Sequence, residues 1–334
     1  MTISDNDVRY RADGRRGHVE SYFFRANHPT QRLAFWLKAT ILAQADGDSV
    51  AELWSIVFDG ARHRVAAHKA TVPIAAACFG TAADGIDVAG AHFDLGVPGA
   101  SVGSVEDHCS WDLRWEQGHD VLGTPLRMFP HDFMYEAPLP KSKFLTPHPV
   151  LRASGTLTAW GETFVVDRWL GMQGHNWGRE HAAEYAWGQC NFTDARGEPL
   201  CSVEAFSGRI KLGPVTTPLL SGMVVRREGV EYRFDRALDF WRQDAVIDDM
   251  HWRLGLRGPD GEAHLLMHGE PQDMACLLYN NPTGRASYCF NSKLARVHLR
   301  VNPHNAEGFE CRSAHAGALE FLRAQPDSRF SRVV

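Results

Sequence analysis

The stretch between Trp169 and Asn191 contains the side chains of this sequence that are best suited to chemistry. A His-x-Trp pair, His175 and Trp177, stands between glycines, and a series of alternate residues follows it. That series is Tyr185, Trp187, Gln189 and Asn191. Alternate side chains of a β-strand point to one face, so these four would form a row. Aromatic faces beside neutral amides are typical of a ligand cavity, which has apolar walls and a few placed polar groups.

We therefore predict that the tryptophans and amides of this stretch contact a ligand. The predicted substrate-binding residues are Trp169, Trp177, Trp187, Gln189 and Asn191. The alternative is a strand that packs its aromatic residues into a core and leaves its amides at a wetter end.

Strands are needed to position such a row, and a period of two dominates the chain. Apolar and charged residues alternate in four segments, 111–116, 230–235, 251–257 and 296–301. One apolar and one charged face are expected of antiparallel strands that cover a core and face water. Gly-containing turns between such segments favour hairpins, and hence an all-β fold of barrels or sandwiches. A helix is expected only over Ala314–Gln325, which Pro326 ends.

A change in composition divides the chain. Six of the 17 prolines lie in residues 121–149. Because proline cannot donate to a central ladder, we expect this segment to cross between two β units, residues 15–120 and 150–330. A short internal echo supports duplication, since 107–113 and 248–254 share Asp, Trp and Leu in register.

Composition excludes several classes of function. The 334 residues carry a net charge of −5, whereas a nucleic-acid binder needs a basic face and a protein held on anionic lipid needs basic clusters. The N-terminus is polar, and no stretch reaches the roughly 20 apolar residues of a spanning helix. We expect a cytoplasmic protein with no nucleic-acid partner and no transmembrane segment. The oligomeric state stays open.

Cysteine and histidine spacing predicts no metal site. The seven cysteines are scattered and never spaced as Cys-x-x-Cys, so reduced buried thiols are expected. The nearest histidine pairs, His175 with His181 and His264 with His268, lack a third ligand nearby. Phosphate-binding and dinucleotide-binding glycine motifs are also absent from the sequence.

Four blocks of the sequence carry a family resemblance: Pro138–Pro149, Ser154–Thr158, Gly174–Gly178 with Tyr185–Asn191, and Ser110–Trp115. They resemble the family of carotenoid 1,2-hydratases (hydroxyneurosporene synthases), AttH-type proteins and tocopherol cyclases. The resemblance implies two antiparallel lipocalin-like (calycin-type) β-barrels in tandem, joined by the Pro-rich segment. It also implies a cofactor-independent enzyme that acts on isoprenoid, polyketide or lipid molecules, adding water to an alkene or closing a ring onto one.

Such a reaction begins with an acid. Protonation of an isolated alkene requires a desolvated carboxylic acid with a raised pKa, and aromatic faces then stabilise the carbocation. In the carotenoid hydratases a Tyr-x-Asp pattern follows His-x-Trp and supplies that acid. Here Tyr185 is followed by Trp187, so the acid must come from elsewhere. The carboxylates considered are Glu204, Asp167 and Glu184, and the predicted catalytic residues are His175, Tyr185, Glu204 and Asp167.

Two readings of function remain. The first is a hydratase, isomerase or cyclase that acts on a hydrophobic unsaturated ligand at the junction of the barrels. The second is a non-catalytic carrier of lipid or terpenoid, since barrels of this kind do both. A buried carboxylate that faces the cavity beside Trp187 and Tyr185 would favour the enzyme, because a carrier needs only an apolar lumen. His175 has a structural alternative too, in which it braces a turn by bonding backbone.

Overall fold

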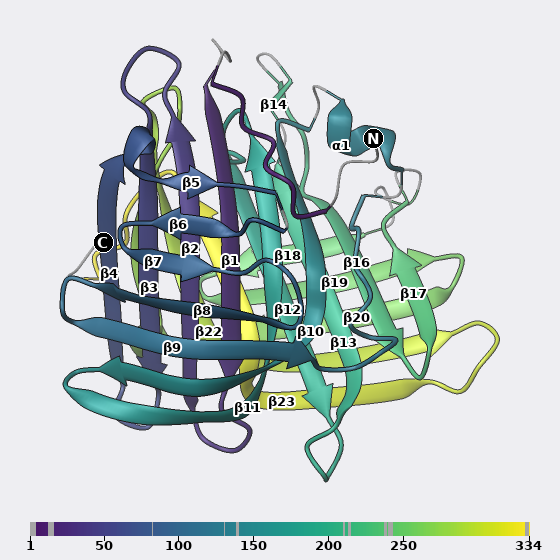
Figure 1. The fold of residues 1–334 in the computed structure, drawn as a ribbon. Coiled ribbons are helices and arrows are strands. Elements are labelled where there is room, and N and C mark those ends of the chain that lie inside the picture. The colour runs from purple at the N-terminus through teal and green to yellow at the C-terminus, as the bar shows by residue number, and fades with distance from the viewer. Residues whose placement is uncertain are drawn as a thin grey trace.

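The alternating segments form strands in two large antiparallel sheets of the computed structural model (Figure 1). It describes residues 5–12, 17–81, 83–129, 131–137, 140–209, 211–212, 215–236, 239, 243–330 and 334. The all-β fold class predicted from the sequence is confirmed. Among the described residues, none of the helices has the length and apolar character needed to cross a membrane.

The first sheet has the strand order β4-β3-β2-β1-β11-β10-β9-β8-β7-β6-β5. Its strands are β1 (His18–Asn27), β2 (Leu33–Ala43), β3 (Val50–Asp59), β4 (Arg64–Pro73), β5 (Cys78–Phe79), β6 (Ile86–Val88), β7 (Ala91–Phe93), β8 (Gly99–Val105), β9 (Cys109–Gln117), β10 (Ser142–Ala159) and β11 (Glu162–Gly178). Figure 1 shows β6–β9 crossing in front of the upright β1–β4, so the sheet curls over on itself. A core that includes Phe24, Phe35 and Trp115 fills the space between.

The second sheet has the order β17-β16-β13-β12-β23-β22-β20-β19-β18, and β21 pairs with β22. Its strands are β12 (Glu184–Thr193), β13 (Pro199–Arg209), β16 (Leu220–Arg227), β17 (Val230–Phe234), β18 (Asp244–Asp248), β19 (His251–Gly258), β20 (Gly261–His268), β21 (Ala275–Asn280), β22 (Ala286–Pro303) and β23 (Phe309–Arg323). The remaining elements are α1 (Phe133–Glu136), the 3-10 helices η1 (Ile74–Ala76) and η3 (Pro271–Asp273), and the small hairpin β14 (Lys211–Leu212) with β15 (Val215–Thr216).

Both sheets follow one topological plan. In each, the first strand pairs with the second on one side and with the last on the other, as β1 does with β2 and β11 and β12 does with β13 and β23. This is the duplication that the sequence predicts. The echo at 107–113 and 248–254 falls near β9 and β19, which occupy different places in the two strand orders.

Strands β10 and β11 belong to the first sheet, although the sequence places residues from 150 onward in the second unit. β11 pairs with β1, and β10 pairs with both β11 and β9. The end of the Pro-rich segment is itself part of β10, whose register shifts beside Pro147 and Pro149 accommodate residues that cannot donate to a ladder. From sheet membership, we propose that the two barrels divide between Gly178 and Glu184.

The helix expected over Ala314–Gln325 is wrong, because this segment lies in strand β23. β23 is paired on both sides, by β12 and β22. Ala318 and Leu322 face the core between the barrels, whereas Leu319 and Phe321 face the core of the second barrel. Apolar residues on both faces hide the period of two, which is why the sequence pattern misled.

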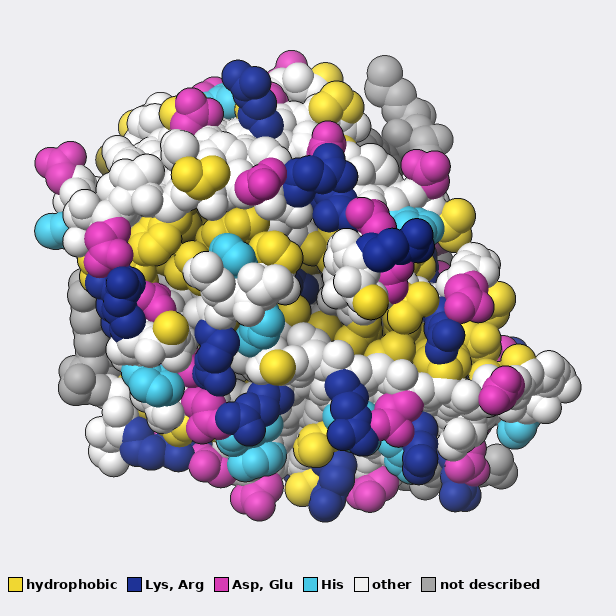
Figure 2. All heavy atoms as spheres, turned by 90° about the horizontal axis from the view of Figure 1, so that it is seen from below, with side chains coloured by type: hydrophobic (Ala, Val, Ile, Leu, Met, Phe, Trp, Pro, Cys, Tyr) yellow, Lys and Arg dark blue, Asp and Glu magenta, His cyan; other side chains and the backbone are white. Residues whose placement is uncertain are grey.

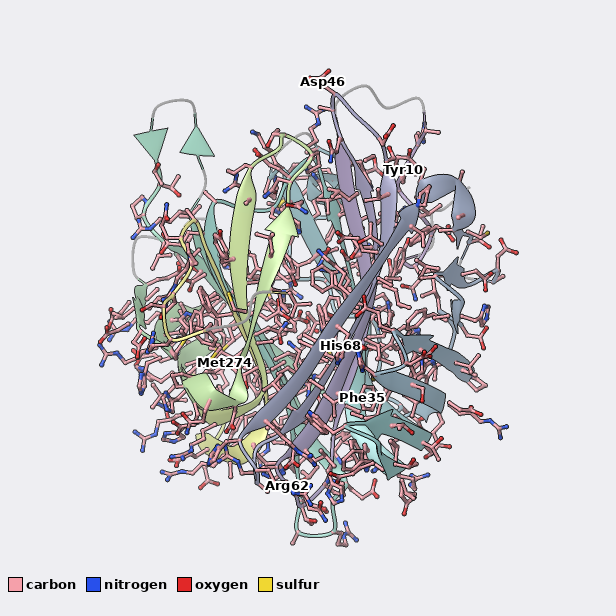
Figure 3. All side chains as sticks on the ribbon, turned by 90° about the vertical axis from the view of Figure 1, so that its left-hand side faces the viewer. Tyr10, Phe35, Asp46, Arg62, His68 and Met274 are labelled. Atoms are coloured by element: carbon pink, nitrogen blue, oxygen red, sulfur yellow. The ribbon has the colours of Figure 1, made fainter. Side chains whose placement is uncertain are left out.

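The outer faces of the two sheets pack against each other. The core between them includes Phe23, Trp36 and Trp54 from the first sheet and Trp187 and Leu277 from the second. Seen from the side, Asp46 and Arg62 lie near opposite ends of the molecule, and β3 runs between them (Figure 3). Viewed from below, basic, acidic and histidine side chains are interspersed over the surface (Figure 2).

Candidate functional site

A cavity of about 1120 Å³ lies where the Pro-rich segment and β10 meet the second sheet. Its apolar walls include Phe23, Met128, Phe129, Met134, Phe144, Trp187 and Phe206. Phe133, 67% exposed, and the exposed Arg236 also line it, so the cavity opens to solvent on the side of α1 and of the segment after β17. A volume of this size accommodates a ligand of ordinary drug size or larger.

The strands direct alternate side chains into this cavity. On β12, Ala186 and Cys190 point into the core of the second barrel, whereas Tyr185 and Trp187 point toward the first. Glu204 on β13 lies opposite Gln189, which shares the face of Trp187. The period of two predicted for both strands therefore places Glu204 on the cavity side of the sheet.

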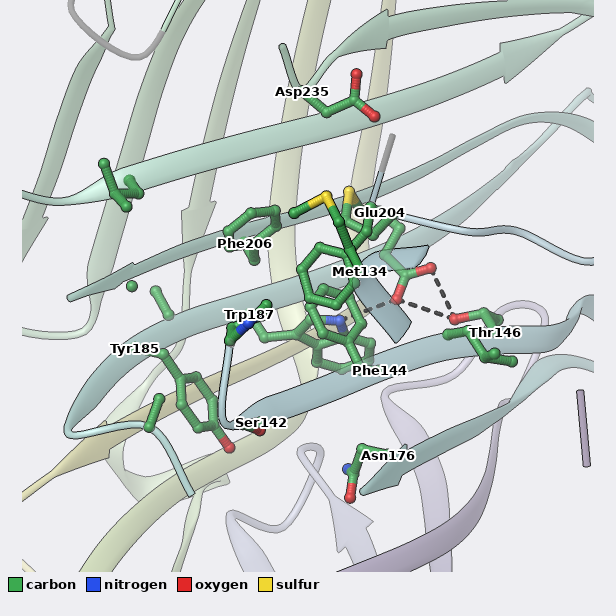
Figure 4. Close-up of a pocket in the computed structure, with 18 of the residues that line it drawn as sticks. Met134, Ser142, Phe144, Thr146, Asn176, Tyr185, Trp187, Glu204, Phe206 and Asp235 are labelled. Atoms are coloured by element: carbon green, nitrogen blue, oxygen red, sulfur yellow. Dashed lines mark hydrogen bonds between the residues drawn. The ribbon is translucent and has the colours of Figure 1, made fainter. Parts of the chain in front are cut away.

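Glu204 is a buried carboxyl group held by two donors. The hydroxyl of Thr146 donates to its Oε1 and Oε2 at 3.0 and 2.8 Å, and Nε1 of Trp187 donates to Oε1 at 3.0 Å (Figure 4). Glu204 is 1% exposed and has no ion-pair partner among the described residues. The arrangement fixes the carboxyl group beside the indole ring.

Burial dominates the protonation of this group. Desolvation raises the pKa of Glu204 to about 7, against the opposing effects of the Thr146 and Trp187 hydrogen bonds and of the positive charges of Arg226 and Arg25. A carboxyl group in an apolar site is neutral when its charge is not compensated. Near neutral pH Glu204 can therefore donate a proton to a ligand in the cavity.

A second polar group lines the cavity across Trp187. The hydroxyl of Tyr185 lies 3.5 Å from Oε2 of Glu320, and Oε1 of Glu320 accepts from Nζ of Lys293 at 2.8 Å and from Nδ2 of Asn291 at 2.9 Å. Lys293 is fully buried and also lies over the Trp187 ring, 5.8 Å from its centroid. Figure 4 shows Tyr185 and Glu204 on opposite sides of Trp187.

His175 and Trp177 lie away from this cavity. Nδ1 of His175 donates to the carbonyl oxygen of Asp5 at 2.7 Å, and Nε2 bonds to Oε1 of Glu20 at 2.8 Å. Tyr22 stacks on the imidazole with ring centroids 4.2 Å apart, and Trp177 covers it at 4.8 Å. His175 thus ties β11 to β1 and to the N-terminal segment, from a position within a strand and not at a turn.

The amide half of the predicted row packs between the barrels. Nδ2 of Asn191 donates to the carbonyl oxygens of Pro149 and Gly171 at 3.1 and 3.0 Å, and Nε2 of Gln189 donates to Oδ1 of Asn191 at 2.9 Å. These amides satisfy backbone carbonyl groups beside the bulges of β10. They hold the first sheet against β12 and do not line the cavity.

The other carboxylates and the remaining tryptophan considered from the sequence do not line it. Trp169 is 1% exposed in the core of the first barrel, beside Phe35. Asp167 is exposed on β11, and Glu184 accepts from Nε of Arg209 at 3.1 Å. The structure therefore brings together Tyr185, Trp187 and Glu204 of the predicted set, and catalytic or binding roles for the rest stay predictions.

The histidine pairs considered as metal ligands are not assembled into a site. Within the described residues, no group of three or more His, Cys, Asp and Glu side chains is arranged to hold a metal ion. His181 lines the cavity, where burial lowers its pKa to about 3, and its ring stacks on Tyr279. A neutral imidazole there extends the aromatic wall.

Sequence reasoning missed Thr146, Glu320 and Lys293. Thr146 lies between prolines in the segment expected to be a connector, and Glu320 lies in the segment expected to be a helix. A lone glutamate within Gly317–Leu322 was the available signal, because an acidic residue in an apolar strand must be paired or functional. Lys293 lies at the centre of β22 among both apolar and polar residues, so the sequence around it gives no such signal.

No protein-family model matches the chain, and no curated protein matches it. Two solved structures share its fold. A protein from Nitrosomonas europaea assigned as an AttH superposes with a TM-score of 0.56 at 13% identity, over 91% of this chain and 92% of its own. Kievitone hydratase from Nectria haematococca superposes with a TM-score of 0.53 at 11% identity, over 92% of this chain and 89% of its own. The resemblance read from the sequence is thus confirmed at the level of the fold.

Proposed function

We propose that this protein is a hydro-lyase-type enzyme that adds water to an apolar unsaturated small molecule, or removes it, with Glu204 as the proton donor. The observation that carries the proposal is the position of Glu204, buried at the wall of an aromatic cavity without a counter-ion among the described residues. A desolvated carboxylic acid that is still protonated near neutral pH is what alkene protonation requires here.

The walls suit the cation that protonation creates. Trp187 and Phe144 present aromatic rings beside the Glu204 carboxyl group, and Phe23 meets Trp187 edge to face at 5.9 Å. Aromatic faces attract a cation without capturing it covalently, so they stabilise the intermediate until water arrives. An isomerase or a cyclase would begin with the same protonation and differ only in how the cation is resolved.

The shared fold agrees with this chemistry, since one of the two neighbours is a hydratase by name. A carrier of lipid or terpenoid is the competing function. A carrier gains nothing from Glu204, because a buried carboxyl group without a counter-ion costs stability whenever it ionises. We therefore favour a cofactor-independent enzyme over a carrier, and the following experiment separates the two.

The test follows labelled oxygen. The protein is incubated with a panel of trisubstituted alkenes such as farnesol, and with the corresponding tertiary alcohols, in water labelled with oxygen-18. Mass spectrometry then detects alcohol formed with the label. We expect turnover of at least one compound, with a loss of about 100-fold or more in Glu204→Gln, as is usual when a general acid is removed. The exposed Glu116 gives the matched control, Glu116→Gln, which should retain activity.

Tight binding of panel compounds with no labelled product, and with equal binding by Glu204→Gln, would instead identify a carrier. Turnover that survives in Glu204→Gln would show an enzyme that uses another acid. Either result contradicts the proposal.

A further inference from the structure

The geometry points to Glu320 as the base of the same reaction, receiving a proton from the attacking water while Glu204 gives one to the alkene. This inference rests on the proposed function and assigns the second half of its chemistry. Glu320 lines the same cavity and is buried beside Tyr185, yet nothing in the acid role of Glu204 uses it.

The strand register places both carboxyl groups on one face of the second sheet. Glu204 on β13 lies opposite Gln189, and Glu320 on β23 lies opposite Trp187, two residues away on β12. Two strand spacings and a two-residue offset separate their Cα atoms by about 12 Å. Trp187 lies between the two, so a ligand on its ring face has one carboxyl group at each side.

The surroundings of the two carboxyl groups differ in charge. Glu204 receives hydrogen bonds from a hydroxyl and an indole, whereas Glu320 pairs with the ammonium group of Lys293. Around Glu320 lie Tyr185 on β12, Cys289 and Lys293 on β22, Tyr279 on β21 and Lys38 from the first barrel. The carboxylate of Glu320 is thereby paired with a positive charge, whereas Glu204 has no ion-pair partner among the described residues. Two carboxyl groups in different environments can take the acid and the base role in one site.

One oxygen of Glu320 is left for catalysis. Oε1 is taken by Lys293 and Asn291, while Oε2 has only long contacts, 3.5 Å from the Tyr185 hydroxyl and 3.8 Å from Sγ of Cys289. Oε2 and the Tyr185 hydroxyl then form the acceptor that faces the ligand.

The proton balance closes on these groups. The π bond of the alkene breaks as one carbon takes the proton of Glu204, and a water oxygen bonds to the cationic carbon. The oxonium loses a proton to Glu320, through the Tyr185 hydroxyl, which passes its own proton to Oε2. The site ends with Glu204 ionised and Glu320 neutral, and proton exchange with solvent restores both. The net reaction is alkene plus water giving alcohol.

A binding measurement tests the charge at Glu320 without any turnover. The cationic probe is N,N-dimethyloctylamine, and its neutral match in shape is octyl dimethyl carbinol. At about pH 6 the carboxyl group of Glu204 is mostly neutral. Of the other carboxylates that line the cavity, Glu231 and Asp235 pair with Arg233, and Asp260 accepts from the backbone N–H of Arg233. We therefore expect the binding of the amine beside Trp187 to depend on Glu320. We expect Glu320→Gln/Lys293→Met to lose about tenfold or more in affinity for the amine while it binds the carbinol as before.

Glu320→Gln alone should also lose affinity for the amine and keep its affinity for the carbinol. This single variant replaces the double variant if the latter fails to fold. The exposed Glu116, which does not line the cavity, gives the matched control, since Glu116→Gln should bind the amine as the unaltered protein does. Equal amine affinity in the Glu320 variants and the unaltered protein would overturn the inference.

A second measurement separates the two steps once a substrate is known. In deuterium oxide, Glu320→Gln should still exchange deuterium into the alkene, because the cation forms and collapses, but should make little alcohol. Glu204→Gln should lose both exchange and alcohol. If no alkene on the panel reacts, the proposed function fails while the amine measurement still decides whether Glu320 presents its charge to the cavity. Normal alcohol formation by Glu320→Gln would exclude it as the base.

Discussion

Glu204 and Glu320 have identical side chains, and their neighbours give them different chemistry. One lies against Trp187 and Thr146 with no ion-pair partner in the described structure, and the other is held by Lys293. Burial of the first carries a free energy that depends on pH, because a group whose pKa differs between folded and unfolded chains couples folding to proton binding. That coupling makes the state of Glu204 measurable even before a substrate is known.

We expect Glu204→Gln to change the pH dependence of stability. In the unfolded chain Glu204 ionises near its ordinary pKa of 4.5, whereas burial raises the pKa to about 7 in the fold. Stability from the bound proton is complete below pH 4.5 and is lost as the pH rises through about 7. Glutamine never ionises, so the variant should gain up to about 3 kcal/mol relative to the unaltered protein at about pH 8 and nothing at about pH 4.

Urea unfolding over this pH range measures the difference. The exposed carboxylate of Glu116 provides the control, since Glu116→Gln should shift stability by less than about 0.5 kcal/mol at either end. A difference that does not vary with pH would show that Glu204 titrates normally in the fold.

Thr146→Val should move the alkaline limb of activity to higher pH. The Thr146 hydroxyl stabilises the ionised carboxylate with bonds to both oxygens, so its removal raises the pKa of Glu204 further. Because a hydrogen bond to a charged group contributes about 1.5 kcal/mol, its loss should shift the alkaline limb by about one pH unit. The pH profile of kcat/KM, or titration of the carboxyl carbon by NMR, detects it. Thr156→Val, an exposed threonine on the same strand, should leave the limb in place.

Among the elements, β12 and β13 show what sequence patterns can predict. The period of two predicted strand β12, and with it the common face of Tyr185 and Trp187. The same alternation gives Ser202, Glu204 and Phe206 a common face on β13, which puts one acid beside the indole. These features are local, because a strand's own alternation sets which side chains share a face.

The rest depends on pairing across the chain. The amides of β12 contact the bulges of β10 because two sheets pack together. The pairing of Glu320 with Lys293 likewise depends on a residue of another strand, β22. The type and spacing of His175 led to its prediction as a catalytic residue, and they could not reveal its partners Asp5 and Glu20, which lie 170 and 155 residues away. No local pattern reports such partners.

The strand pair β1 and β11 is held by a buried ionic cluster at Glu20, and Glu20→Gln should destabilise it. Burial alone would raise the pKa of Glu20, but hydrogen bonds from His175 and His18 outweigh it and hold the pKa well below its usual range. Stability from this ionised group is present above pH 4.5 and is lost as the pH falls through the folded pKa. Loss of one partner of a buried pair should cost about 3–5 kcal/mol at about pH 7, and less below pH 4.

Denaturant unfolding at the two pH values checks this, with Glu162→Gln as the control on the same sheet, where the carboxylate is 45% exposed beside Arg62 and Arg64. A loss of similar size in acid and at neutral pH would mean that packing, and not charge, accounts for the effect.

For the molecule as a whole, the two barrels share one extended interior. The core between them joins tryptophans of the first sheet to Leu277 and Trp187 of the second. Polar contacts cross the same interface, where Nδ2 of Asn27 donates to the carbonyl oxygen of Lys293 at 2.6 Å and Asp273 accepts from Arg32. The cavity lies at this junction, so its geometry depends on how firmly the barrels are docked.

We therefore expect the whole chain to unfold in one cooperative transition. Leu37→Ala in the first core and Leu256→Ala in the second each remove a buried side chain, at a cost of about 2–5 kcal/mol. Because exposing one barrel also exposes the shared core, both variants should lower the same melting temperature and keep the calorimetric and van't Hoff enthalpies equal. Leu277→Ala weakens only the shared core. In this variant the calorimetric and van't Hoff enthalpies should no longer be equal, although both barrels keep their strands. Two resolved transitions in the unaltered protein, with Leu37→Ala moving one of them and Leu256→Ala the other, would show that the barrels fold independently and that the cavity joins two separable units.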